Sequence, residues 1–131
     1  MGETRMKRTA VIVTLALAAC GVTPPSEMRQ AKPDGQDILP APPRAAAECV
    51  QTQLAEQKNT AALARPTNTL LFSPTTVSIH GNTANESIWL IDFDPDGKGG
   101  SAIQWRVGSM VLSHKEASQE IKAAIGRCRP A

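Results

Sequence analysis

Ser87-Ile88-Trp89-Leu90-Ile91-Asp92-Phe93 is the stretch of this 131-residue chain that decides its fold. The run is apolar from its second to its fifth residue and is rich in β-branched and aromatic side chains, which favour strands. Its length suits a strand and is short for a helix. We therefore predict a buried central strand over 87–93.

The segments on either side of this strand alternate between polar and apolar residues. Residues 76–80 (TVSIH) and 103–107 (IQWRV) both have a period of two, which is typical of strands. Short loops rich in Asn, Asp and Gly separate them from the central run, and such loops join antiparallel neighbours. The sequence therefore predicts a three-stranded antiparallel meander.

Two helices are expected around the meander. Residues 45–64 are rich in Ala, Gln and Glu, lack Gly and Pro, and should end before Pro66. Ser113 and Glu116 match a capping box, after which a helix should run to Arg127 with an apolar stripe that ends at Cys128. We predict an α+β fold for residues 45–131: a small two-layer sandwich in the order α-β-β-β-α.

The N-terminus is organised as an export signal. Residues 6–8 (MKR) are basic, and residues 9–17 (TAVIVTLAL) form an apolar run that is too short to cross a bilayer. Leu17-Ala18-Ala19-Cys20 follows, and it resembles the lipobox of bacterial lipoproteins. The alternatives are an uncleaved membrane anchor, or a core helix with a chance cysteine.

The resemblance implies a signal peptide over residues 1–19, cleaved after Ala19. It also implies that Cys20 carries a thioether-linked diacylglycerol and an N-linked acyl chain such as palmitate. In the family, an aspartate after the lipidated cysteine favours retention in the inner membrane. This chain has Gly21 there, so we expect an outer-membrane lipoprotein, on the periplasmic side or at the surface.

Residues 20–44 are expected to be the lipidated cysteine and a proline-rich tether. Residues 21–44 hold six of the ten prolines and few large apolar residues. Such a segment would span roughly 27 Å as a flexible coil and about 75 Å as polyproline II, so the domain would stand off from the membrane. A docking strip for a proline-recognising partner or the cell wall is the alternative to a passive spacer.

The other two cysteines, Cys49 and Cys128, are expected to form a disulfide, because an exported chain meets an oxidising environment. Two buried thiols, or a bridge to another envelope protein, are the alternatives. The net charge of +2 belongs to the export signal: residues 1–19 hold three of the 14 basic and one of the 12 acidic residues. The remaining chain is formally neutral, which gives no reason to expect an anionic partner.

Asp92, Asp94 and Asp96, followed by Gly97, reproduce the opening of a calcium loop. The pattern then departs from that motif: Ile103 stands where a bidentate Glu is needed, and the flanks are predicted strands rather than helices. A hairpin turn is therefore favoured over a weak calcium site. Otherwise we expect no metal and no cofactor.

The two histidines, His80 and His114, have no metal-ligand partner at a recognised spacing. His80 is expected to be an exposed strand residue and His114 to lie in the first turn of the last helix. Ser78, His80 and Asp92 could be drawn as a catalytic triad, but a chain of this size allows many such triples. We expect no enzyme, and find no phosphate-binding loop, small-molecule motif or basic stripe for nucleic acid.

Ile88 and Leu90 should lie on the face of the meander away from the helices, among polar neighbours. This arrangement indicates either a protein-binding patch or two tolerated residues, exposed or covered by 70–72. We expect a non-enzymatic envelope lipoprotein that binds a protein or a cell-wall component such as peptidoglycan. There are two alternatives. The protein could be a periplasmic inhibitor of an incoming enzyme such as lysozyme, or a component of a secretion, conjugation or surface-exclusion system.

Overall fold

The computed structural model describes residues 22–57, 66–109 and 113–131. Its elements follow one another along the chain as α2 (Pro25–Met28), β1 (Gly35–Leu39), α3 (Pro43–Glu56), β2 (Thr67–Phe72), β3 (Val77–Asn82), β4 (Ser87–Pro95), β5 (Ser101–Val107) and α4 (His114–Arg127). The five strands form one antiparallel sheet in the order β1-β5-β4-β3-β2. The fold class is therefore α+β, as the sequence predicts.

The predicted meander is present as β3, β4 and β5, with the central apolar run in the middle of the sheet. The prediction of only three strands is wrong, because β1 and β2 extend the sheet at its two edges. None of the six residues of β2 is fully buried, and only Leu39 is buried in β1. Half-exposed edge strands carry a weak hydrophobic period, which explains why the pattern did not reveal them.

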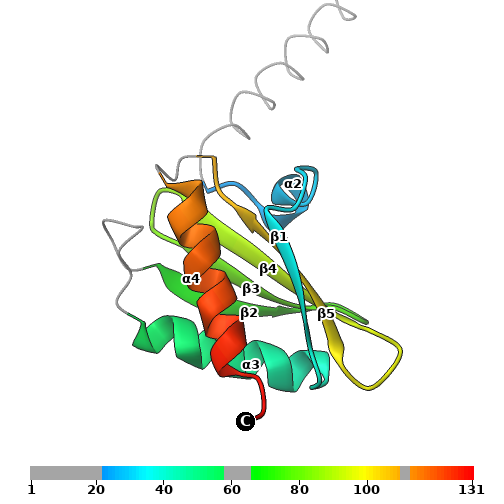
Figure 1. Ribbon diagram of the computed structural model, residues 1–131. Coiled ribbons are helices and arrows are strands. Elements are labelled where there is room, and N and C mark those ends of the chain that lie inside the picture. The colour runs from blue at the N-terminus through cyan, green and yellow to red at the C-terminus, as the bar shows by residue number, and fades with distance from the viewer. Residues whose placement is uncertain (1–21, 58–65, 110–112) are drawn as a thin grey trace, which may run out of the picture.

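Helices α3 and α4 pack on the same face of the sheet (Figure 1). Helix α4 begins at His114, and the Ser113 hydroxyl accepts a hydrogen bond from the Glu116 N–H, as predicted. Helix α3 begins at Pro43 and ends at Glu56, with Gln57 already extended, while residues 58–64 of the predicted helix lie outside the described residues. The Cys49 and Cys128 Cα atoms, one on each helical segment, lie 6.0 Å apart and are joined by the expected disulfide.

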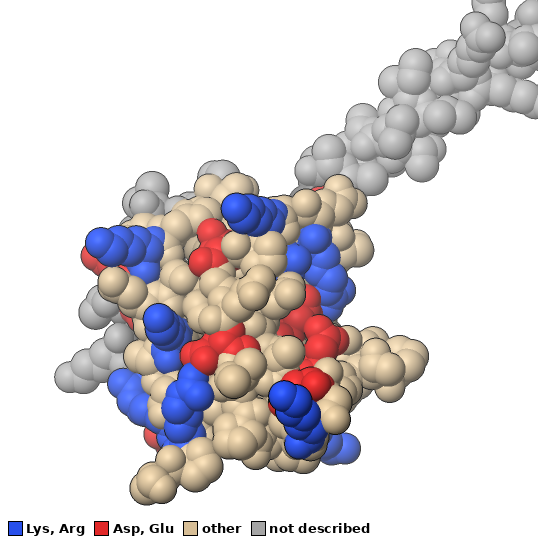
Figure 2. All heavy atoms as spheres, turned by 45° about the vertical axis from the view of Figure 1, so that its right-hand side comes forward, with Lys and Arg blue, Asp and Glu red and all other residues tan. Residues whose placement is uncertain are grey.

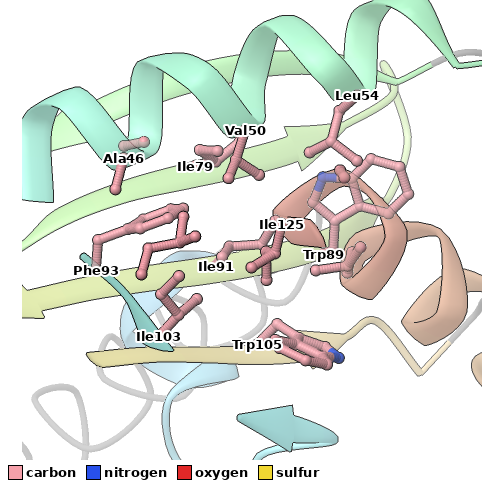
Figure 3. Packing of buried hydrophobic residues seen from close by; sticks show 14 of the residues in the cluster. Ala46, Val50, Leu54, Ile79, Trp89, Ile91, Phe93, Ile103, Trp105 and Ile125 are labelled. Atoms are coloured by element: carbon pink, nitrogen blue, oxygen red, sulfur yellow. The ribbon is translucent and has the colours of Figure 1, made fainter. Parts of the chain in front are cut away.

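The core lies between this helical face and the sheet (Figure 3). Ala46, Val50 and Leu54 point from α3 toward Ile79, Trp89 and Phe93, and Ile125 of α4 meets the same cluster. Eight residues of the meander are buried in this core: Val77, Ile79, Trp89, Ile91, Phe93, Ile103, Trp105 and Val107. Burial of these side chains supplies the main driving force for the fold.

Each of the two buried tryptophans lies over a glycine of the neighbouring strand. Gly81 pairs with Trp89 and Gly35 pairs with Trp105. A Cβ atom at Gly81 would lie 2.3 Å from the Trp89 ring, and one at Gly35 would lie 2.2 Å from the Trp105 ring. The Trp105 indole N–H donates to Ser118 of α4 at 2.7 Å, which links the sheet to that helix. The glycines are thus required by close packing of the indole rings.

Candidate functional site

The second face of the sheet, away from α3 and α4, is crossed by residues Thr23–Asp34, which we call the N-terminal strap. The Ser87 hydroxyl donates to the Thr23 carbonyl at 2.6 Å, and Arg106 Nε donates to the Ala31 carbonyl at 2.8 Å. Asp34, the last residue of the strap, is bound to β5. Its carboxylate accepts a hydrogen bond from the Val107 N–H at 2.7 Å, and its own N–H donates to the Trp105 carbonyl.

The strap corrects the prediction of a free tether over residues 20–44. Most of that segment belongs to the fold: α2 lies in the strap and β1 pairs with β5 along its whole length. The prolines fit the structure because Pro25 and Pro43 stand at helix N-termini, where the missing N–H costs nothing. Composition alone suggested a spacer, but β1 is held by main-chain pairing with β5 and the strap is held by side chains of β4 and β5.

A buried charge cluster holds the middle of the strap. Asp92 of β4, whose side chain is only 8% exposed, accepts hydrogen bonds from Arg29 at 3.1 and 2.9 Å and from Ser78 at 2.6 Å. Arg106 of β5 lies 3.6 Å from the same carboxylate. The hydrogen bond to Asp92 raises the pKa of Arg29 despite the opposing effect of burial. One carboxylate thus pairs with two guanidinium groups, which compensates the cost of burying it.

The expected binding patch at Ile88 and Leu90 is not exposed. Ile88 is 2% and Leu90 0% accessible to solvent. The premise of that hypothesis is therefore wrong. Two polar residues of the neighbouring strands, Ser78 and Arg106, bind the strap.

The structure does not assemble Ser78, His80 and Asp92 as a catalytic triad. Ser78 donates directly to Asp92, while His80 Nε2 lies 3.1 Å from the Ser87 hydroxyl. Because Ser87 gives its proton to the Thr23 carbonyl, His80 must act as the donor in that pair. Burial lowers the pKa of His80. His80 and Ser87 thus form a chain of hydrogen bonds that ends on the Thr23 carbonyl of the strap.

The three aspartates of the candidate calcium loop have separate partners. Asp92 binds the arginines, and Asp94 accepts from the Thr76 hydroxyl. Asp96 accepts from the backbone N–H groups of Lys98 and Gly100 at 2.7 and 2.9 Å, which lowers its pKa. Gly97 and Gly99 have φ angles of +80° and +85°, as this turn requires. Across the described ranges, no group of three or more His, Cys, Asp or Glu residues could hold a metal ion.

A pocket of about 400 Å³ opens beside the strap, between its two ends and the start of α4. Met28 and Val107 form part of its apolar lining, and the His114 ring nitrogen Nδ1 lies 3.8 Å from the Asp34 carboxylate at its rim. His114 lies in the first turn of α4, as predicted. The lining mixes acidic, basic and apolar groups, so it does not select one class of ligand.

Sequence reasoning missed Arg29 and Asp34. The available signal was Asp92, a charged residue inside an apolar strand, because a buried charge needs a partner. Figure 2 shows acidic and basic side chains interspersed over the face that bears α2 and β1, with neither sign forming a continuous field. Within the described part of the chain, no helix is long and apolar enough to cross a membrane.

Comparisons with family models, with curated proteins and with solved structures find no match to this chain.

Proposed function

We propose that this chain is a bacterial envelope lipoprotein, anchored through Cys20 in the outer membrane. The observation that carries the proposal is the sequence Leu17-Ala18-Ala19-Cys20 after a basic segment and a short apolar run. The fold supports it through the cysteines: Cys49 and Cys128 are paired with each other, which leaves Cys20 as the one available for lipid. A disulfide also fits an oxidising compartment.

Metabolic labelling with a fatty acid tests the anchor. The wild-type protein should incorporate the label and sediment with membranes, whereas Cys20→Ser should lose both properties. The matched control is the double variant Cys49→Ser/Cys128→Ser, which removes two cysteines and should keep the label. Labelling of Cys20→Ser, or none in the wild type, would contradict the proposal.

We further propose that the domain acts by binding rather than by catalysis, with a protein or the cell wall as its partner. The hydroxyl, imidazole and carboxylate groups of the second face are engaged in holding the strap, which supports a structural role for them. Among the described residues, the large apolar side chains that remain exposed are Ile38 at 63% and Phe72 at 60%, one on each edge strand. Arg44 lies over the Phe72 ring at 5.4 Å.

Photo-crosslinking in intact envelopes tests this binding proposal. A photoreactive residue at position 38 or 72 should give a discrete adduct that the same residue at exposed Gln119 does not give. Identical adducts from all three positions, or none from 38 and 72, would contradict it. A lysozyme-type enzyme in the adduct would identify the protein as an inhibitor, whereas a secretion or conjugation protein would place it in such an assembly.

A further inference from the structure

The distance between the proposed lipid anchor and the folded domain is short. Thr23 is the first described residue whose backbone is hydrogen-bonded to the sheet, and it follows Cys20 by three positions. Three residues can span at most about 11 Å, since consecutive Cα atoms are about 3.8 Å apart. A lipidated Cys20 at the bilayer interface would therefore keep Thr23 close to the lipid headgroups.

Thr23 is fixed relative to the rest of the domain. The strap is attached near its start by Ser87, in its middle by Asp92 and near its end by Arg106. These contacts reach two different strands, β4 and β5, so movement of the strap away from the sheet would break several hydrogen bonds at once. The anchor is thus coupled to one end of the domain rather than to a loose spacer.

That end of the domain contains the β3–β4 turn, the end of β5 and the start of α4 (Figure 1). Thr23 contacts Ser87, the first residue of β4. The β4–β5 loop and the C-terminus lie at the opposite end. The nine residues of β4 separate the two ends by about 26 Å at roughly 3.3 Å per residue.

The charges near the anchored end do not favour a particular lipid. Glu27 and Lys32 line the pocket beside Thr23, and Lys115 and Glu116 follow in the first turn of α4, so both signs are present. Attraction to an anionic surface would need a cluster of one sign and would weaken in salt. The position of this end at the membrane should therefore depend on chain length and not on ionic strength.

We propose that the short anchor holds the β3–β4 turn against the lipid surface and directs the β4–β5 loop away from it. This inference rests on the proposed lipidation of Cys20. It replaces the expected stand-off by a fixed orientation, in which the loop end of the domain faces the compartment and its partners.

Fluorescence quenching in phosphatidylcholine vesicles that contain a headgroup spin label tests the orientation. The lipidated mature protein is labelled at Asn85→Cys in the β3–β4 turn or at Lys98→Cys in the β4–β5 loop, both exposed turn positions. Ala84→Cys gives a second site in the near turn if Asn85→Cys does not fold. The labels at 85 and 84 should lose most of their fluorescence, in low or high salt, and the label at 98 should lose little. Equal quenching at both ends, or stronger quenching at 98, would overturn the inference.

A variant with ten Gly and Ser residues inserted between Val22 and Thr23 is the matched control. It keeps every contact of the strap but lengthens the anchor, so the difference between positions 85 and 98 should disappear. A difference that persists would overturn the role of the short anchor. Mass spectrometry of each sample separates the two proposals: an unlipidated Cys20 refutes the proposed anchor, whereas lipidated protein with equal quenching refutes only the orientation.

Discussion

Arg29 binds Asp92 through two hydrogen bonds, although the two residues are 63 positions apart in the chain. Arg29 belongs to a segment whose composition suggests a linker, and Asp92 belongs to the central strand of the sheet. This pair shows that the domain includes part of the segment that was predicted to be a tether. The folded unit thus includes the strap and β1, which precede the predicted boundary at Ala45.

Replacing Asp92 should destabilise the domain more than replacing Arg29. Asp92→Ala leaves the nearly buried Arg106 without its carboxylate, and breaking such a buried pair costs about 3–5 kcal/mol. Arg29 is 42% exposed and can be replaced by water, so Arg29→Ala should cost about 1 kcal/mol. Urea unfolding monitored by circular dichroism measures both. Equal losses, or a larger loss for Arg29→Ala, would contradict the central role of Asp92 in the charge cluster.

Substitution of two glycines by alanine should have opposite effects. In Gly81→Ala the new methyl group would lie 2.3 Å from the Trp89 indole. The indole must then move, which should lower the free energy of unfolding by about 1–3 kcal/mol. Gly126→Ala lies in α4 with nothing within 4 Å of the new Cβ, so it should stabilise by about 0.5–1 kcal/mol. Thermal unfolding and Trp fluorescence measure the two effects. A neutral Gly81→Ala with an unchanged Trp spectrum would show that the ring is not packed on this glycine.

The disulfide should contribute substantially to stability. It closes a loop with a sequence separation of 79 residues, and in the chain-entropy model the lost freedom of the unfolded chain is worth about 4.5 kcal/mol. Reduction, or Cys49→Ala/Cys128→Ala, should lower the melting temperature. Non-reducing electrophoresis should show a compact monomer that migrates more slowly after reduction. A disulfide-linked dimer, or two free thiols in the native protein, would contradict the internal bridge.

Stability should fall in mildly acidic solution because of His80. Burial lowers the pKa of His80 below its ordinary value of 6.5, so the folded state binds this proton less readily than the unfolded chain. The stabilisation from neutral His80 is complete above the unfolded pKa and is lost as the pH falls toward the folded pKa. The urea midpoint should decrease from about pH 7.5 to about pH 5.5, and the decrease should be smaller in His80→Gln. An identical decrease in His80→Gln would assign the pH dependence to other groups.

The sequence revealed those parts of the fold in which apolar side chains repeat with a regular period. β3, β4, β5 and α4 each bury one or both faces, and a buried face must be apolar. β1 and β2 are held at the edges mainly by backbone hydrogen bonds, which any residue can make. Their sequences therefore carry little signal.

The candidate site was less predictable than the fold. The alternation of side chains in β4 predicted that Ile88 and Leu90 lie on the second face. The strap across that face could not be predicted, because Arg29 and Asp34 lie in a proline-rich segment. The unusual feature in the sequence was the presence of Asp92 and Arg106 in strands that are otherwise apolar. Such charges indicate buried partners, but not where in the chain those partners lie.

Mass spectrometry of the N-terminal peptide of the mature protein tests the central claim most directly. The proposed anchor requires a chain that begins at Cys20, with a diacylglycerol on its sulfur and an acyl chain on its amino group. A mature N-terminus at any other residue, or an unmodified Cys20 thiol, would contradict the assignment of this protein as an envelope lipoprotein.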